Sequence, residues 1–248
     1  MDGVLVIDKP SGCTSHDVVS RVKRMLRAKK VGHLGTLDPM ATGVLPLVIN
    51  RATKWATKLE GSEKEYLAVM KLGEETDTQD AEGQVIATKG FDGIGSDEIK
   101  EVFARFTGKV EQLPPMYSAV KKNGVPLYKL ARKGITIERT PKLIEIEEIE
   151  LQKLELPFVT FRVACSRGTY IRTLCSDIGE ALGTHAHLTS LRRTVSGRFK
   201  VDSALALNIS GAELKAGIIP LELFEAEEAS LTKDTDMSSD EKVRTASA

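Results

Sequence analysis

Apolar residues form short segments that predict β-strands. Residues 3–7 and 44–49 are nearly continuous apolar runs, as expected for buried strands, whereas residues 64–72 alternate between apolar and polar positions. Residues 142–151 and 158–165 have similar strand-like composition and are also expected to be strands.

Three other segments repeat apolar residues with the period of an α-helix. The first begins at Thr14 or Ser15, a favourable N-cap, and the other two cover about residues 96–106 and 171–182, each followed by glycine. Positively charged side chains occupy the remaining faces of the first helix and the residues after it: Arg21, Lys23, Arg24, Arg27, Lys29 and Lys30. They suit either contacts with phosphates or an ordinary solvated face.

The loop before strand 44–49 carries the main candidate for catalysis. It reads Gly-His-Leu-Gly-Thr-Leu-Asp-Pro-Met-Ala-Thr-Gly-Val-Leu-Pro over residues 32–46. Pro39 disfavours helical backbone at Asp38, and Gly35 and Gly43 tolerate backbone angles that other residues avoid. Asp38 is therefore expected on a stiff loop beside a buried strand, which is how scaffolds often present catalytic groups. An ordinary Asx turn is the alternative.

Charge is unevenly distributed along this chain of zero net charge. Residues 1–58 contain ten Lys or Arg against four Asp or Glu, and residues 109–139 and 161–200 contain seven against two each. Residues 222–248 contain three against eight. A basic body with an acidic tail suits a polyanionic partner such as nucleic acid.

Several classes of protein are not indicated. The odd number of cysteines and the absence of a Cys-x-x-Cys pair suggest reduced thiols and a cytoplasmic protein. No signal peptide, membrane span or dinucleotide fingerprint is recognisable, so neither membrane association nor a cofactor is expected. His185 and His187 lack a third ligand at a recognisable spacing, and the acidic segment 73–83 does not fit a calcium loop, so no metal is expected.

Several motifs together resemble the TruB family of tRNA pseudouridine synthases. The loop 32–46 matches the family signature, and further matches are Lys9-Pro10, the segment 76–83, Ser-Arg-Gly-Thr-Tyr-Ile-Arg at 166–172 and Leu-Arg-Arg at 191–193. The resemblance covers roughly residues 3–221. It implies an α+β protein with the pseudouridine synthase fold, in which helices and loops flank a mixed, mostly antiparallel central sheet.

The resemblance also implies roles for particular residues. Asp38 would be the catalytic residue, and the substrate-binding residues would be His33, Tyr66, Tyr170, Arg172, Leu191 and Lys9. Tyr66 would stack on the target base, Tyr170 would lie at the base, and Leu191 would border the nucleotide pocket. Arg172 would pair with Asp38, and such a pair is expected to hold the pKa of the carboxyl down.

Residues 1–221 are expected to form one catalytic domain of a monomeric protein. A basic segment of about residues 112–140, with Pro, Gly and two tyrosines, is implied to be an insertion that contacts RNA. Residues 222–248 are expected to be a disordered acidic tail, because few apolar residues remain there. That tail is too short for the PUA domain of many relatives.

The implied activity is isomerisation of uridine to pseudouridine at position 55 in the T loop of tRNA, on a base flipped out of its stack. One carboxylate at C1′ can add covalently or stabilise positive charge on the sugar, as in glycosidases. The uracil leaves as a stabilised anion, so one Asp is sufficient. The alternatives are an RNA-binding or tRNA-folding module without chemistry, and a nucleoside hydrolase, which would need a second carboxylate.

Overall fold

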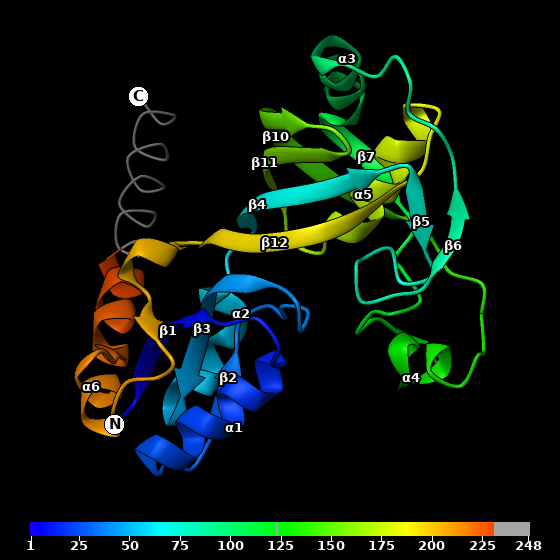
Figure 1. Cartoon of the computed structure of the whole chain (residues 1–248). Helices are drawn as coiled ribbons and strands as arrows, with labels where there is room; N and C mark the ends of the chain where they lie inside the picture. Colours follow the sequence, from blue (N-terminus) through cyan, green and yellow to red (C-terminus); the bar gives the residue numbers. More distant parts are fainter. Residues whose placement is uncertain (123, 231–248) are drawn as a thin grey trace, which may run out of the picture.

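One large sheet runs through the molecule and joins two lobes (Figure 1). The computed structural model describes residues 1–122 and 124–230. In that part of the chain the strand order is β14-β1-β3-β12-β4-β11-β10-β7, and β2, β13 and β15 pair with β3, β12 and β1. The pairs β1–β14 and β3–β12 are parallel and the other pairs are antiparallel. The α+β class and the mostly antiparallel mixed sheet are thus confirmed.

The elements follow the chain with few long interruptions. The strands of the large sheet are β1 (Gly3–Lys9), β2 (Val31–His33), β3 (Thr42–Ile49), β4 (Glu63–Leu72), β7 (Gly108–Gln112), β10 (Lys142–Glu155), β11 (Phe158–Ser166), β12 (Ala186–Ser196), β13 (Phe199–Lys200), β14 (Leu205–Ala206) and β15 (Ile219–Pro220). Two small hairpins lie outside it: β5 (Glu74–Thr76) with β6 (Val85–Thr88), and β8 (Lys121–Lys122) with β9 (Val125–Pro126). The helices are α1 (Ser15–Leu26), η1 (Asn50–Trp55), α2 (Ala56–Leu59), α3 (Ser96–Phe106), α4 (Leu127–Ala131), α5 (Ile171–Ala181), η2 (Val201–Ser203) and α6 (Gly211–Ala216).

Strand β12 is the link between the lobes, and the sequence pattern does not reveal it. It lies between β3 and β4, parallel to β3 and antiparallel to β4. Its buried positions include His187, Arg193 and Ser196, so polar side chains point into the protein where a strand pattern calls for apolar ones. Tertiary partners, not intrinsic propensity, stabilise this strand.

Helices and core then follow from the apolar stripes. Thr14 and Asp17 form a capping box at the start of α1, whose buried face includes Val18, Val19 and Val22. Helix α5 packs on β12 and α3 packs on β10. The apolar residues form one large buried cluster spanning both lobes and a smaller one beneath β1, β3 and the last described helix.

The expectation of a disordered tail from residue 222 is wrong for its first nine residues. Residues 221–230 are helical, and Leu221 and Phe224 are buried. The ring of Phe224 packs on that of Phe199, with the ring centroids 6.4 Å apart, and apolar burial of this kind is sufficient to order the segment. Residues 231–248 lie outside the described residues. Within the described part of the chain, no helix is long and apolar enough to cross a membrane.

Candidate active site

The loop that carries Asp38 is fixed by hydrogen bonds to neighbouring segments. The Ser15 hydroxyl accepts a hydrogen bond of 2.8 Å from the Leu37 N–H and donates one of 3.0 Å to the Leu37 carbonyl. The Gly12 N–H donates to the carbonyl of Pro39 at 2.9 Å. The start of α1 therefore holds the residue immediately before Asp38, and the loop is rigid as the sequence predicts.

Lys9 fastens the other side of the same loop. Its side chain is fully buried, and its ammonium donates hydrogen bonds to the carbonyls of Pro10 (3.0 Å), Pro39 (3.1 Å) and Ala41 (2.6 Å). Burial lowers the pKa of Lys9, against the effect of nearby Cys13 and Asp38. All three donors are used within the protein. We therefore propose that Lys9 positions the loop, in place of the substrate-binding role that the family resemblance implies.

A buried arginine that sequence reasoning did not single out holds the loop from below. Arg193, on β12, is 1% exposed; its Nε donates to the Val44 carbonyl at 2.9 Å and its guanidinium donates to the Gly35 carbonyl at 3.1 Å. Gly43 faces the backbone of Arg193, and a Cβ there would lie 2.1 Å from the Arg193 carbonyl oxygen. Gly43 also has φ of +104°, a region in which residues with a Cβ are strained. The Leu-Arg-Arg motif thus contributes to the shape of the catalytic loop.

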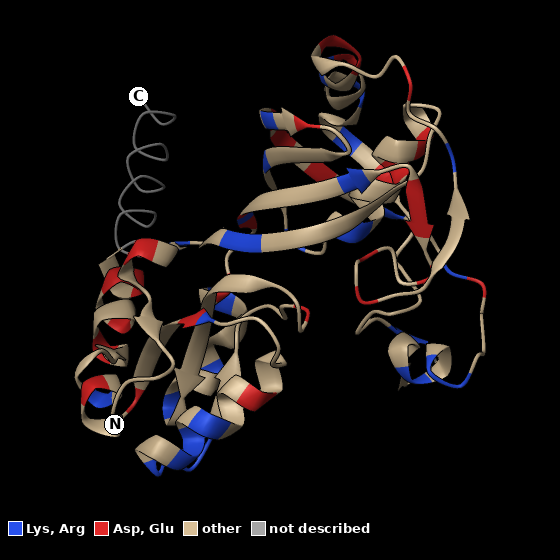
Figure 2. Ribbon diagram, in the orientation of Figure 1, with Lys and Arg blue, Asp and Glu red and all other residues tan. Residues whose placement is uncertain are grey.

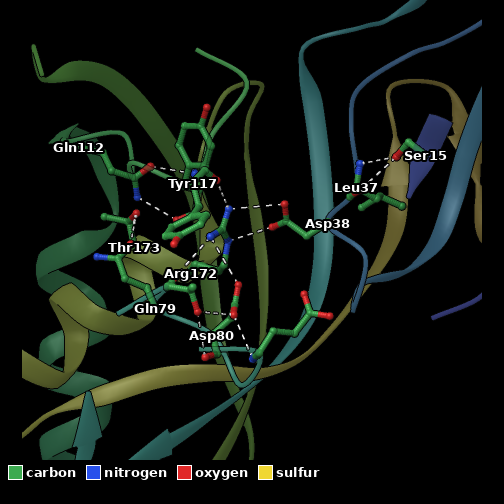
Figure 3. A network of polar contacts seen from close by, with 12 residues as sticks. Ser15, Leu37, Asp38, Gln79, Asp80, Gln112, Tyr117, Arg172 and Thr173 are labelled. Atoms are coloured by element: carbon green, nitrogen blue, oxygen red, sulfur yellow. Dashed lines mark hydrogen bonds and ion pairs between the residues drawn. The ribbon is translucent and has the colours of Figure 1, made fainter. Parts of the chain in front are cut away.

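Arg172 and Asp38 meet as the resemblance implies, although 134 residues separate them in sequence (Figure 3). Nε of Arg172 lies 2.9 Å from Oδ2 of Asp38, and a second guanidinium nitrogen donates to Oδ1 at 3.4 Å. The Arg172 side chain is 4% exposed, whereas that of Asp38 is 35% exposed. The carboxylate can therefore meet a ligand while its counter-ion stays inside the protein.

Three other acceptors share the guanidinium of Arg172. The carbonyls of Thr78 and Tyr117 accept hydrogen bonds at 3.0 and 2.8 Å, and Oδ2 of Asp80 lies 3.4 Å away. Figure 3 shows these contacts around one planar side chain. Because Tyr117 belongs to the basic insertion and Thr78 and Asp80 to the acidic turn, Arg172 joins three segments at Asp38.

The pKa of Asp38 is shifted upward, against the direction expected from sequence. Burial raises it most, Arg172 lowers it, and the nearby carboxylate of Asp80 raises it again. The expectation that Arg172 would hold the pKa below its ordinary value is wrong in its net direction. The physical reason is that Arg172 divides its charge between two carboxylates in a site with little water.

The two tyrosines lie near this carboxylate on different elements. Tyr66, on β4, is 8% exposed and stands opposite Arg193 of β12 in the sheet register. Tyr170 precedes α5, and the Gln112 side chain clasps its backbone, donating to its carbonyl at 3.1 Å and accepting from its N–H at 2.8 Å. Burial raises the pKa of both phenols, so neither is tuned toward a phenolate base at neutral pH.

His33 and Leu191 complete the set of sequence-predicted residues. His33 is half-buried on β2, and burial lowers its pKa. Its Nδ1 is buried and makes no hydrogen bond within the described residues. Leu191 is buried on β12 opposite Ala68 of β4 and belongs to the large apolar cluster, where it can contribute a wall of the site.

The acidic turn after β5 uses its oxygens within the protein. Oδ1 of Asp80 accepts hydrogen bonds from the Thr78 hydroxyl (2.6 Å) and the Glu82 N–H (3.1 Å), and Asp77 accepts from the Gln84 N–H at 2.8 Å. His187 contacts the Glu74 carbonyl at 3.1 Å through Nδ1. No group of three or more metal-ligating side chains occurs in the described part of the chain.

Comparisons with known proteins agree with this geometry. Residues 23–171 match the model of the TruB family pseudouridylate synthase N-terminal domain, and residues 172–219 match that of the tRNA pseudouridylate synthase B C-terminal domain. A tRNA pseudouridine synthase B from Geobacter sulfurreducens is 53% identical over 84% of this chain and 68% of its own length. The relative of the same name from Opitutus terrae is 47% identical over 89% of this chain and 93% of its own length.

A solved structure supports the fold. A chain of a Cbf5-Nop10-Gar1 complex superposes with a TM-score of 0.65 and 37% identity over 83% of this chain. Our chain spans 52% of that chain's length. Sheet, site and similarities define the class of protein as a pseudouridine synthase, an isomerase. Within that class, the chain belongs to the TruB family of tRNA pseudouridine synthases.

Proposed function

We propose that this protein isomerises uridine to pseudouridine at position 55 in the T loop of tRNA, with Asp38 as the catalytic carboxylate. The observation that carries the proposal is the pair of Asp38 and Arg172, in which an accessible carboxylate is backed by a buried guanidinium. Such a carboxylate can approach C1′ of a nucleotide while Arg172 keeps it oriented and stabilises its charged form.

The reaction needs no net input of atoms or electrons. The bond from C1′ to N1 breaks, Asp38 adds to C1′ or stabilises its positive charge, the uracil turns, and a bond from C1′ to C5 forms. The C5 proton is then lost and N1 gains a proton, so the product is an isomer of the substrate. Tyr66 would stack on the uracil, and Leu191 would border it.

Base access requires that the target uridine leave its stack, at a cost of a few kcal/mol. His33 would contact the opened loop, and Tyr170 would lie against the flipped base. The insertion supports the binding of the surrounding RNA, because its exposed side chains include Lys121, Lys122, Lys129, Arg132 and Lys133 (Figure 2). We expect a monomer, in which one chain supplies all of these groups.

The test compares wild type with Asp38→Asn on an unmodified tRNA transcript. Pseudouridine is mapped by carbodiimide-dependent stops of primer extension, and tRNA binding is measured separately by filter binding. We expect a stop at position 55 with wild type, none with Asp38→Asn, and similar binding by both. The exposed acid Asp202 provides a matched control, and Asp202→Asn should remain active.

The same experiment separates the alternatives. A non-catalytic RNA-binding module would bind tRNA and leave uridine unchanged with either variant. A nucleoside hydrolase would release free uracil, which chromatography of the reaction mixture would detect. Either result, or full activity of Asp38→Asn, would overturn the proposed function.

A further inference from the structure

A dense group of positive charge lies along α1 and the residues after it. It consists of Arg21, Lys23, Arg24, Arg27, Lys29 and Lys30, which we call the α1 basic surface. Residues 21–30 contain no Asp or Glu. All six cationic side chains are exposed, because the opposite face of the helix packs Val18, Val19 and Val22 into the core. Figure 2 shows this surface at the outer edge of the first lobe.

The acids nearest to this surface are occupied elsewhere. Asp17 accepts hydrogen bonds from the N–H and hydroxyl of Thr14, and Glu213 of the neighbouring α6 accepts the same two bonds from Ser210. The Asn50 side chain accepts from the backbone N–H groups that follow the helix, but it is neutral. Among the described residues, no ion pair or side-chain hydrogen bond involves any of the six cations.

Other basic residues of the same lobe are treated differently. Arg51, Lys58 and Arg198 pair with Glu225, Glu228 and Glu227 of the helix at residues 221–230. That helix lies beyond the segments matched by the family models, which end at residue 219. The chain thus supplies acidic partners to one basic area of this lobe and leaves the α1 basic surface without them.

The surface is also connected to the catalytic loop. Ser15, the first residue of α1, holds Leu37 beside Asp38 through two hydrogen bonds. At 1.5 Å per residue, Arg21 lies about 9 Å and Arg27 about 18 Å along the helix axis from Ser15. A polyanion bound at Asp38 would therefore have to continue for several nucleotides to reach these side chains.

We propose that the α1 basic surface binds backbone phosphates of the RNA substrate outside the flipped nucleotide, and so forms a second contact area besides the insertion. The proposal rests on the RNA substrate of the proposed function and extends its binding site. Arginine at i and i+3, as in Arg21 and Arg24, offers forked donors that match phosphate oxygens. The competing explanation is that these cations only interact with the helix dipole, which would stabilise the helix and leave RNA binding unaffected.

The test compares two double variants that remove equal charge from exposed helix positions. Arg21→Gln/Arg24→Gln alters the α1 basic surface, and Lys100→Gln/Arg105→Gln alters α3, at the far end of the molecule (Figure 1). Glutamine has nearly the helix propensity of Arg and Lys, so both variants should fold, which circular dichroism and thermal melts will check. Filter binding gives the Kd for unmodified tRNA transcript and for its isolated T-arm hairpin at several salt concentrations.

We expect the α1 variant to bind tRNA more weakly and with less dependence on salt. Each lost phosphate contact removes about 0.7–0.9 from the slope of log K against log salt concentration, which is about five- to eightfold in affinity at 0.1 M relative to 1 M salt. The α3 variant should bind like wild type. If only the transcript is affected, the contact lies outside the T arm, and if the hairpin is affected too, it lies on the T stem.

Wild-type Kd and salt slope for the α1 variant would overturn the proposal, as would equal losses in the two variants. A change in melting temperature without a change in Kd would assign these cations to the helix dipole and also overturn it. Because binding is measured without reference to product, a wild-type protein that bound tRNA but made no pseudouridine would contradict the proposed function alone.

Discussion

Arg172→Gln should make the activity of the protein depend on pH in a characteristic way. The substitution removes the cation that lies 2.9 Å from Asp38 and leaves a neutral side chain that can still donate a hydrogen bond. In the native site, burial raises the pKa of Asp38 and Arg172 opposes that rise. Without the arginine, only the opposing contribution is lost, so the pKa of Asp38 must increase further.

The size of this change follows from the geometry. An arginine within contact distance lowers the pKa of an Asp by about 1–3 units. Because Asp38 must be ionised to act, activity falls as the pH drops through its pKa. The acid limb of the pH–rate profile should therefore move upward by about 1–3 pH units in Arg172→Gln. Arg172→Lys retains the charge but not the fork, so its limb should move less.

The assay is single-turnover conversion with enzyme in excess over tRNA, followed by tritium release from C5-labelled uridine between pH 5 and 9. Asp80 is 6% exposed and loses its counter-ion as well, so a thermal melt must accompany each rate to exclude unfolding. Arg162→Gln is the matched control, since Arg162 is also ion-paired, with Glu65, but has no contact with Asp38.

A uniform loss at every pH would refute the reasoning, because it would mean that Arg172 acts without changing the ionisation of Asp38. A limb that moved to lower pH would refute it more directly. Recovery of Arg172→Gln at alkaline pH, while Arg162→Gln keeps the wild-type profile, is the expected result.

Three further predictions follow from positioning and burial. Lys9→Met should lower the free energy of unfolding in urea by about 1–3 kcal/mol, since buried carbonyls lose their donor, and should reduce kcat while leaving the Kd for tRNA unchanged. Gly43→Ala should cost about 3–5 kcal/mol in the same assay, because its Cβ would lie 2.1 Å from the Arg193 carbonyl oxygen. Burial raises the pKa of Asp177 to about 6. Its protonated form is favoured in the folded state, so its destabilising effect is absent near pH 4 and full above about pH 6. Asp177→Asn should therefore be more stable than wild type at pH 8, by about 1 kcal/mol after allowance for its partial exposure, with the difference vanishing near pH 4.

Each of these predictions has an outcome that contradicts it. Weaker tRNA binding by Lys9→Met at unchanged kcat would restore a substrate contact for Lys9. Gly183→Ala serves as control for Gly43, because it has φ of +77° but no atom within 4 Å of its Cβ, and an equal loss in both would remove the argument from the close approach. A stability difference in Asp177→Asn that does not vary with pH would show that ionisation is not its cause.

The sequence predicted the parts of the site that motifs encode locally. The loop around Asp38, the strand after it and the turn before α5 are each specified by glycine, proline and apolar runs within a few residues. The pairing of Asp38 with Arg172 was available only through the family resemblance, since nothing in residue spacing relates positions 134 apart.

The features that sequence reasoning missed depend on long-range contacts. Strand β12 has buried Arg193 and His187 at core-facing positions, so its pattern resembles no ordinary strand. The burial of Lys9 depends on three carbonyls from distant turns. The upward shift in the pKa of Asp38 depends on Asp80, whose approach to the same guanidinium could not be inferred from charge counts.

The placement of β12 has a consequence for how the chain could be divided. The two family models meet between Ile171 and Arg172, yet β12, from the second segment, is inserted between β3 and β4 of the first. Severing the chain there would separate Asp38 from Arg172 and leave a gap in the middle of the sheet. Neither fragment would be an autonomous folding unit, but the two together should reassemble by strand insertion, so co-expressed halves would behave as a split enzyme whose activity reports their reunion.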